Sequence, residues 1–159
     1  MHPTSLSIVS GGQTGVDRAA LDSALELGIS CQGWCPRGRK AEDGVIPARY
    51  PLQETPSSSY SQRTGWNVRD SEGTLILTLD GTLKGGTALT RRLAIRLRKP
   101  NLCVDLNSPG STGDCLEWLR SHDVRTLNVA GPRESEEPGI HDLARKYLGD
   151  LFRIWMAWA

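Results

Sequence analysis

Short apolar runs alternate with amphipathic stretches along this chain, and this alternation constrains its fold more than any other feature. Five runs have the length and composition of buried strands, at residues 6–9, 29–33, 74–79, 102–106 and 125–130. Apolar residues recur at the helical period of 3.6 at about residues 15–27, 86–98, 112–121 and 139–155. Because strands that alternate with helices form parallel sheets with right-handed crossovers, we predict an α/β fold. Its mostly parallel, five-stranded sheet is expected to carry helices on both faces, in three layers.

The size and charge of the chain narrow the class of protein. Its 159 residues correspond to one ordinary domain, and we predict a single domain over residues 1–159. Lys and Arg number 19 against 18 Asp and Glu, a balance that argues against nucleic acid or an anionic membrane as partner. No apolar run approaches the ~18 residues of a membrane span, and the four cysteines have no framework spacing. We expect a cytoplasmic protein with reduced thiols.

One connection is much longer than the others. Residues 34–71 are rich in Pro, Gly, Ser and charged residues, yet they also contain aromatic side chains. A connection of this length inside a compact domain is usually functional or disordered. The aromatic residues Tyr50, Tyr60 and Trp66 favour packing against the body, with a short helix at about residues 60–70. We predict that the connection lies near the ligand crevice.

The turn after the first strand is rich in glycine and leads directly into a helix. Such a turn exposes backbone N–H groups at a helix N-terminus, where a phosphate or another oxyanion is favoured. Its glycines allow positive φ and a close ligand approach, and Thr14 is expected to cap the helix together with Asp17. The turn matches neither common nucleotide-binding fingerprint. A tight corner that needs glycine only for its geometry is the alternative. The residues expected to bind the anion here are Gly11, Gly12, Gln13, Thr14 and Gly15.

The other strand ends also carry small, polar or basic residues, at 34–44, 80–87, 107–113 and 131–135. In open α/β sheets, ligands bind beyond the carboxyl ends of the strands. A second glycine pair opens its own helix, which would place two helix N-termini at one crevice. The basic residues of the second loop are expected either to clamp an anion or, as the alternative, to form ion pairs within a solvated loop. The further expected ligand-binding residues are Arg37, Arg39, Lys84, Gly85, Gly86, Thr87 and Arg133, and we expect no metal site.

Catalytic chemistry, if the chain has any, depends on carboxylates. No nucleophile is paired with a histidine in a recognisable elbow. The candidates for acid–base or water-positioning roles are Asp17 and Asp43, followed by Asp80 and Glu134. The alternative to a binding protein is therefore a hydrolase that acts on the N-glycosidic or phosphate-ester bonds of nucleotides. A third interpretation is an oligomeric scaffold, in which the aromatic C-terminal segment, residues 152–158, is buried at a subunit interface.

Five motifs taken together resemble the putative molybdenum carrier family, a circularly permuted YpsA-like branch of the SLOG superfamily. They are SGGQTGVD at 10–17, GWCPRGRKAEDG at 33–44, RTGWN at 63–67, KGGT at 84–87 and GPRES at 131–135. The resemblance implies a Rossmann-like fold, a homo-oligomer, and a pocket for a nucleotide-derived or molybdenum-cofactor-like ligand.

The same resemblance bears on catalysis. Superfamily relatives of the lonely-guy type are phosphoribohydrolases with the signature P-G-G-x-G-T-x-x-E. Gly11 and Gly12 match its glycine pair, but residues 14–15 reverse its G-T order, and Asp17 is out of register with its glutamate. The departure favours binding over hydrolysis. We therefore expect a protein that binds an anionic, nucleotide-like or phosphate-bearing ligand, in the manner of a carrier for the molybdenum cofactor.

Overall fold

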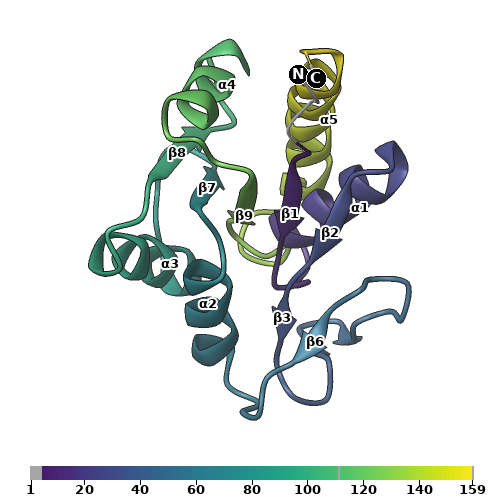
Figure 1. Ribbon diagram of the computed structural model, residues 1–159. Helices are drawn as coiled ribbons and strands as arrows, with labels where there is room; N and C mark the ends of the chain where they lie inside the picture. The colour runs from purple at the N-terminus through teal and green to yellow at the C-terminus, as the bar shows by residue number, and fades with distance from the viewer. Residues whose placement is uncertain (1–4, 111, 159) are drawn as a thin grey trace.

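A five-stranded, all-parallel sheet forms the centre of the molecule in the computed structural model, which describes residues 5–110 and 112–158 (Figure 1). Ser111, in the fourth strand-end segment, lies outside the described residues. The strand order is β2-β1-β9-β7-β8. The strands are β1 (Ser7–Val9), β2 (Ser30–Gln32), β7 (Gly73–Thr78), β8 (Asn101–Asp105) and β9 (Thr126–Ala130). The predicted α/β, Rossmann-like fold is confirmed.

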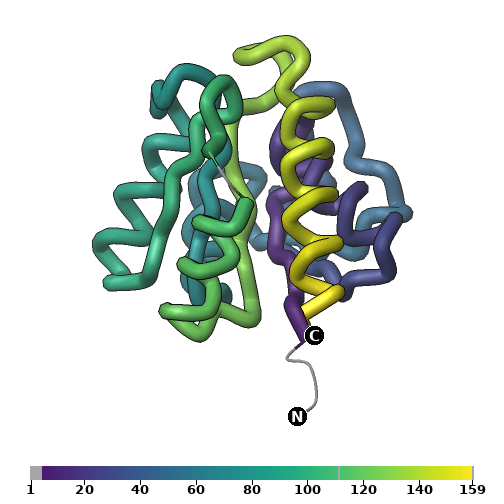
Figure 2. Tube along the Cα trace, turned by 90° about the horizontal axis from the view of Figure 1, so that it is seen from above, coloured from purple at the N-terminus to yellow at the C-terminus, as the bar shows by residue number. Residues whose placement is uncertain are grey.

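The helices form two groups. They are α1 (Val16–Leu27), α2 (Tyr60–Arg69), α3 (Gly85–Arg96), α4 (Thr112–Ser121) and α5 (Ile140–Trp158). Helix α5 packs against both α1 and α4, whereas α2 packs against α3. Figure 2 shows α4 in green and α5 in yellow side by side. Among the described helices, none has the length and apolar character to cross a membrane.

The main hydrophobic core lies between the sheet and the group formed by α1, α4 and α5. Strand β7 is buried along its whole length, which explains its continuous apolar run. Helix α5 contributes a buried stripe at helical spacing, because its apolar residues recur every three or four positions. That stripe consists of Ile140, Ala144, Tyr147, Leu148, Leu151 and Phe152.

The long connection is structured and packs on α1. It contains a parallel pair, β3 (Trp34–Cys35) with β6 (Gln53–Glu54), and a small antiparallel pair, β4 (Lys40–Ala41) with β5 (Gly44–Val45). Helix α2 ends it. A second hydrophobic cluster joins the connection to α1 through Leu21 and comprises Leu21, Cys35, Ala41, Ile46, Tyr50 and Leu52. The connection is thereby held against the glycine turn that precedes α1.

The start of α1 differs from the sequence prediction. Its N-cap is Gly15, and no side chain caps the helix. The Thr14 hydroxyl instead donates to the Glu42 carboxylate and accepts the Glu134 N–H at 3.1 Å. Thr14 is therefore used to join the glycine turn to the long connection and to the loop after β9.

Candidate functional site

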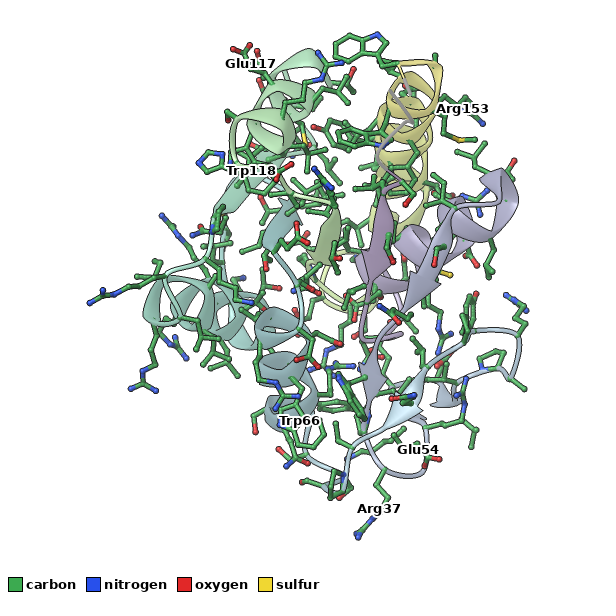
Figure 3. All side chains as sticks on the ribbon, in the orientation of Figure 1. Arg37, Glu54, Trp66, Glu117, Trp118 and Arg153 are labelled. Atoms are coloured by element: carbon green, nitrogen blue, oxygen red, sulfur yellow. The ribbon has the colours of Figure 1, made fainter. Side chains whose placement is uncertain are left out.

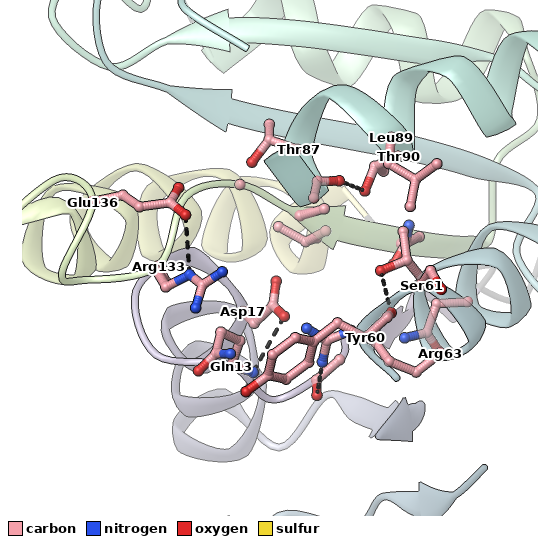
Figure 4. A pocket seen from close by; sticks show the side chains of 18 residues that line it. Gln13, Asp17, Tyr60, Ser61, Arg63, Thr87, Leu89, Thr90, Arg133 and Glu136 are labelled. Atoms are coloured by element: carbon pink, nitrogen blue, oxygen red, sulfur yellow. Dashed lines mark hydrogen bonds and ion pairs between the residues drawn. The ribbon is translucent and has the colours of Figure 1, made fainter. Parts of the chain in front are cut away.

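A cavity of about 270 Å³ lies where the carboxyl ends of the strands meet the N-termini of α1 and α3 (Figure 4). Helix α2 forms one wall, and the end of β9 with the loop after it forms another. This is the edge of the sheet at which open α/β folds bind ligands. The polar lining side chains are Gln13, Asp17, Tyr60, Ser61, Arg63, Thr64, Asn67, Thr87, Thr90, Asn128, Arg133 and Glu136.

Asp17 supplies a buried carboxyl group in this cavity. Only 8% of the residue is exposed, and its Oδ2 accepts the Gln13 N–H at 3.2 Å. Burial raises the pKa of Asp17 from 3.8 to about 6, against the opposing charges of Arg63 and Arg18 and the Gln13 hydrogen bond. A carboxyl group in this environment changes its protonation state close to neutral pH.

Arg63 supplies a buried guanidinium group from the first half of α2. It is 8% exposed, and its Nη1 donates to the Gly11 carbonyl at 2.8 Å. Within the described part of the chain, no carboxylate forms an ion pair with it, and desolvation lowers its pKa. A buried cation with a single neutral acceptor is costly, and the same cation is available to an anion in the cavity.

Gly11 lets the two buried charged groups approach the turn. A Cβ at this position would lie 2.6 Å from Nη1 of Arg63 and 3.0 Å from Oδ2 of Asp17. Any other residue would push one of these side chains away. A glycine at position 11 is therefore required by the side chains around it, and not by its backbone conformation.

Three cations surround the ring of Tyr60, close to the cavity. The Lys40 Nζ lies 4.9 Å from the ring centroid, and the guanidinium carbons of Arg63 and Arg133 lie at 5.2 and 5.7 Å. Each distance is in the range of a cation–π contact. Arg133 is also paired with Glu136 at 3.0 Å. The cluster places three cationic groups on this side of the cavity.

The first turn of α3 faces the cavity from the opposite wall. Gly86 and Thr87 line the cavity. Thr87 is the first residue of α3 whose backbone N–H donates a hydrogen bond, which goes to the Lys84 carbonyl oxygen at 3.0 Å. Within the described residues, the N–H groups of Gly85 and Gly86 have no acceptor. Unpaired N–H groups and the helix dipole together favour an anion at this place.

The comparisons with known proteins agree with this architecture. The model of the Circularly permutated YpsA SLOG family matches residues 8–152. The chain belongs to this family. It is also similar to the crystal structure of a putative molybdenum carrier protein from Syntrophus aciditrophicus SB, with 47% identity and a TM-score of 0.87. That similarity covers 94% of this chain and 96% of the other. Among curated proteins, none matches the chain.

In this SLOG family member, five of the twelve residues expected to bind the ligand line the cavity. They are Gly11, Gln13, Gly86, Thr87 and Arg133, together with the candidate carboxylate Asp17. Lys84 and Gly85 directly precede the lining residues of α3, and Lys84 is exposed. The glycine turns thus contribute backbone and small side chains to two walls.

Other glycine-turn residues serve the local fold. A Cβ at Gly12, whose φ is +76°, would lie 2.5 Å from Cδ1 of Leu52. At Gly15, with φ of +79°, it would lie 2.4 Å from the Pro132 carbonyl oxygen. These two glycines are required because the long connection and the loop after β9 pack directly on the turn. Neither lines the cavity.

The basic loop after β3 is not part of the cavity. Arg39 donates to the carbonyl groups of Ile46, Pro47, Tyr50 and Leu52, so its guanidinium holds the long connection in shape. Arg37 is exposed and points away from the body (Figure 3). Asp43 forms a bidentate ion pair with Arg18. These three side chains are separated from the cavity lining.

The two remaining candidate carboxylates have local partners. Asp80 accepts the side-chain amide of Asn107 at 2.6 Å. Glu134 accepts the N–H groups of Gly139 and His141 at the start of α5. Both serve the ends of their elements and do not line the cavity.

The residues that α2 contributes to the cavity wall were not among the site residues predicted from the sequence. Tyr60, Arg63 and Asn67 line the cavity, although nothing in the strand-end argument points to a helix inside the long connection. The available signal was the RTGWN motif at 63–67, one of the five that carry the family resemblance.

A second, larger hollow of about 420 Å³ beside β2 contains one lining carboxylate, Asp70, which is already paired with Arg69 and Trp34.

Proposed function

We propose that this chain binds a small oxyanionic ligand, of the phosphate-bearing or nucleotide-like class, in the cavity between α1 and α3. The observation that carries the proposal is the buried guanidinium of Arg63, which has one neutral acceptor and lies opposite the free first-turn amides of α3. A phosphate group accepts hydrogen bonds from both kinds of donor. The volume of about 270 Å³ is close to the lower limit of about 300 Å³ for ligand sites, so the ligand or its buried part is small.

A carrier role for this ligand is supported by the similar crystal structure, which is named a putative molybdenum carrier protein. The residues of the cavity suit the anionic end of such a cargo. Its lining contains guanidinium, hydroxyl, amide and backbone N–H groups beside the carboxyl groups of Asp17 and Glu136, and none of the described lining residues is a cysteine or a histidine. We propose that the phosphate of a molybdenum cofactor, and not the metal, is the group that these residues hold.

Replacing Gly86 with aspartate tests the location of the anion without disturbing the fold. A Cβ at Gly86 meets no atom within 4 Å, and an acidic residue in the first turn stabilises a helix by about 0.3–1 kcal/mol. We expect Gly86→Asp to be at least as stable as wild type but to lose binding of inorganic phosphate by at least about tenfold, a loss of about 1.4 kcal/mol. Isothermal titration calorimetry measures the binding, and urea denaturation measures the stability.

Gly86→Asn is the matched control, because it adds the same volume without the charge. It is expected to bind phosphate more tightly than Gly86→Asp does. Equal phosphate affinity of wild type and Gly86→Asp would show that the anion does not lie at the start of α3.

One observation favours a second candidate, the nucleotide hydrolase. The pKa of Asp17, about 6, suits a general acid or base near neutral pH. Incubation of the protein with a panel of nucleoside monophosphates, followed by chromatography for released base or phosphate, separates the two functions. Turnover that disappears in Asp17→Asn would establish the hydrolase. The absence of turnover together with saturable phosphate binding is the result expected for a carrier.

A further inference from the structure

We propose that Asp17 takes up a proton from solvent when an oxyanion enters the cavity, so that the neutral carboxylic acid donates a hydrogen bond to the bound anion. The inference rests on the proposed anion binding and adds a linkage between affinity and pH. It assigns Asp17 as a ligand-contacting residue whose protonation sets the affinity of the site for an anion.

The position of the carboxyl group is the first support. Asp17 projects into the cavity from the first turn of α1, and one of its oxygens accepts the Gln13 N–H (Figure 4). Among the described residues, no donor is bonded to the other oxygen, Oδ1. This oxygen is therefore able to contact a ligand directly.

The size of the cavity is the second support. A volume of about 270 Å³ is that of roughly nine water molecules at ~30 Å³ each. An oxyanion that fills part of this space lies within a few ångströms of the Asp17 carboxyl. Asp17 lies on the buried side of the cavity, where a second negative charge repels its carboxylate more than it would in water, and protonation of the carboxyl removes the repulsion.

Apart from Arg63, the charged groups around Asp17 are already paired, so they do not offset the repulsion that the proton removes. Helix α2 presents Arg63 and Tyr60, the loop after β9 presents Arg133 and Glu136, and α1 itself presents Arg18. Helix α3 contributes no titratable side chain to the lining. Arg18 is already paired with Asp43 and Arg133 with Glu136.

Arg63 is the cation that the ligand and Asp17 share. Its charge opposes the effect of burial on the pKa of Asp17, which is nevertheless raised to about 6. A bound anion would accept hydrogen bonds from Arg63 and add its own negative charge. Both changes move the pKa of Asp17 upward, so the bound state keeps the proton at neutral pH.

Sulfate is the probe that isolates this effect, because it stays a dianion between pH 5 and 8, whereas phosphate gains or loses a proton of its own within this pH range. If only the protonated form binds, the affinity of wild type for sulfate rises by up to about tenfold per unit as the pH falls from 8 to 6, and then levels off. Asp17→Asn imitates the neutral acid. It is expected to bind sulfate equally well at all these pH values, and at pH 8 more tightly than wild type.

The control is Asp142→Asn on α5, since the Asp142 side chain is 95% exposed and does not line the cavity. This variant is expected to keep the wild-type pH profile. Calorimetry at pH 7.5 in buffers of different ionisation enthalpy gives a second measurement, with about one proton taken up per sulfate by wild type and none by Asp17→Asn.

The outcomes separate the two proposals. Sulfate binding by wild type that does not change with pH, or that weakens as the pH falls, contradicts the proton uptake while leaving anion binding in place. The same contradiction follows if wild type and Asp17→Asn share one pH profile. If wild type binds neither sulfate nor phosphate between pH 5 and 8, the proposed function itself fails and the inference fails with it.

Discussion

Replacing Arg63 with methionine is expected to weaken phosphate binding by at least about a hundredfold, a loss of about 2.7 kcal/mol. Arg63 is buried, donates to the Gly11 carbonyl and has no carboxylate partner in the described residues. Truncating one member of a buried charge pair costs about 2–5 kcal/mol. Here Arg63 is the truncated member, and the bound phosphate is the other. Methionine keeps the length of the apolar stem while removing the charge.

The stability of this variant decides whether the loss is specific. Arg63 forms no ion pair among the described residues, and burying an unpaired charge is costly, so Arg63→Met is expected to stay folded by circular dichroism and urea denaturation. Arg69→Met is the matched control on the same helix, because Arg69 is exposed and pairs with Asp70. Similar phosphate affinities for the two variants would remove Arg63 from the site.

Replacing Phe152 with alanine is expected to destabilise the protein by about 3–5 kcal/mol. Phe152 has no exposed surface and lies in the main core, where α5 packs against α1. The lost transfer free energy and the remaining cavity both contribute to this cost. Urea denaturation of the two proteins measures the difference in the free energy of unfolding.

Met156→Ala, four residues further along α5, provides the comparison. Met156 is 45% exposed, so its truncation is expected to cost less than about 1 kcal/mol. A Phe152→Ala effect as small as that of Met156→Ala would mean that the end of α5 does not pack on the core as described.

The fold could be predicted from the sequence because each central element carries its own periodic signal. The run predicted as a strand at 74–79 is β7 at 73–78, and the pattern at 112–121 coincides with α4. The burial of β7 along its whole length agrees with its continuous apolar run, whereas the strand order was not predicted and comes from the structure. The signal at residues 60–70 also located α2, since its polar and apolar residues suit one packed face.

The site could be predicted only in part, because its walls come from segments far apart in sequence. Gly11 and Gly86 belong to strand-to-helix turns, which the general rule for open α/β sheets locates. Arg63 reaches the cavity only because α2 packs against α3, a tertiary contact that no local pattern encodes. Arg39 has the residue type of an anion ligand, but its guanidinium is used by four carbonyl groups of its own loop.

The most direct test of anion binding in this cavity is an amide NMR titration of the isotope-labelled protein with inorganic phosphate at pH 7. The proposed site predicts saturable shifts of the Gly11, Gly86 and Gly131 amides, which belong to three different walls of the cavity. Gly38 and Gly44, in the basic loop outside it, should stay unchanged. Saturable shifts confined to residues 36–44, or no saturable shift at Gly11 and Gly86, would contradict the assignment of this cavity as the binding site.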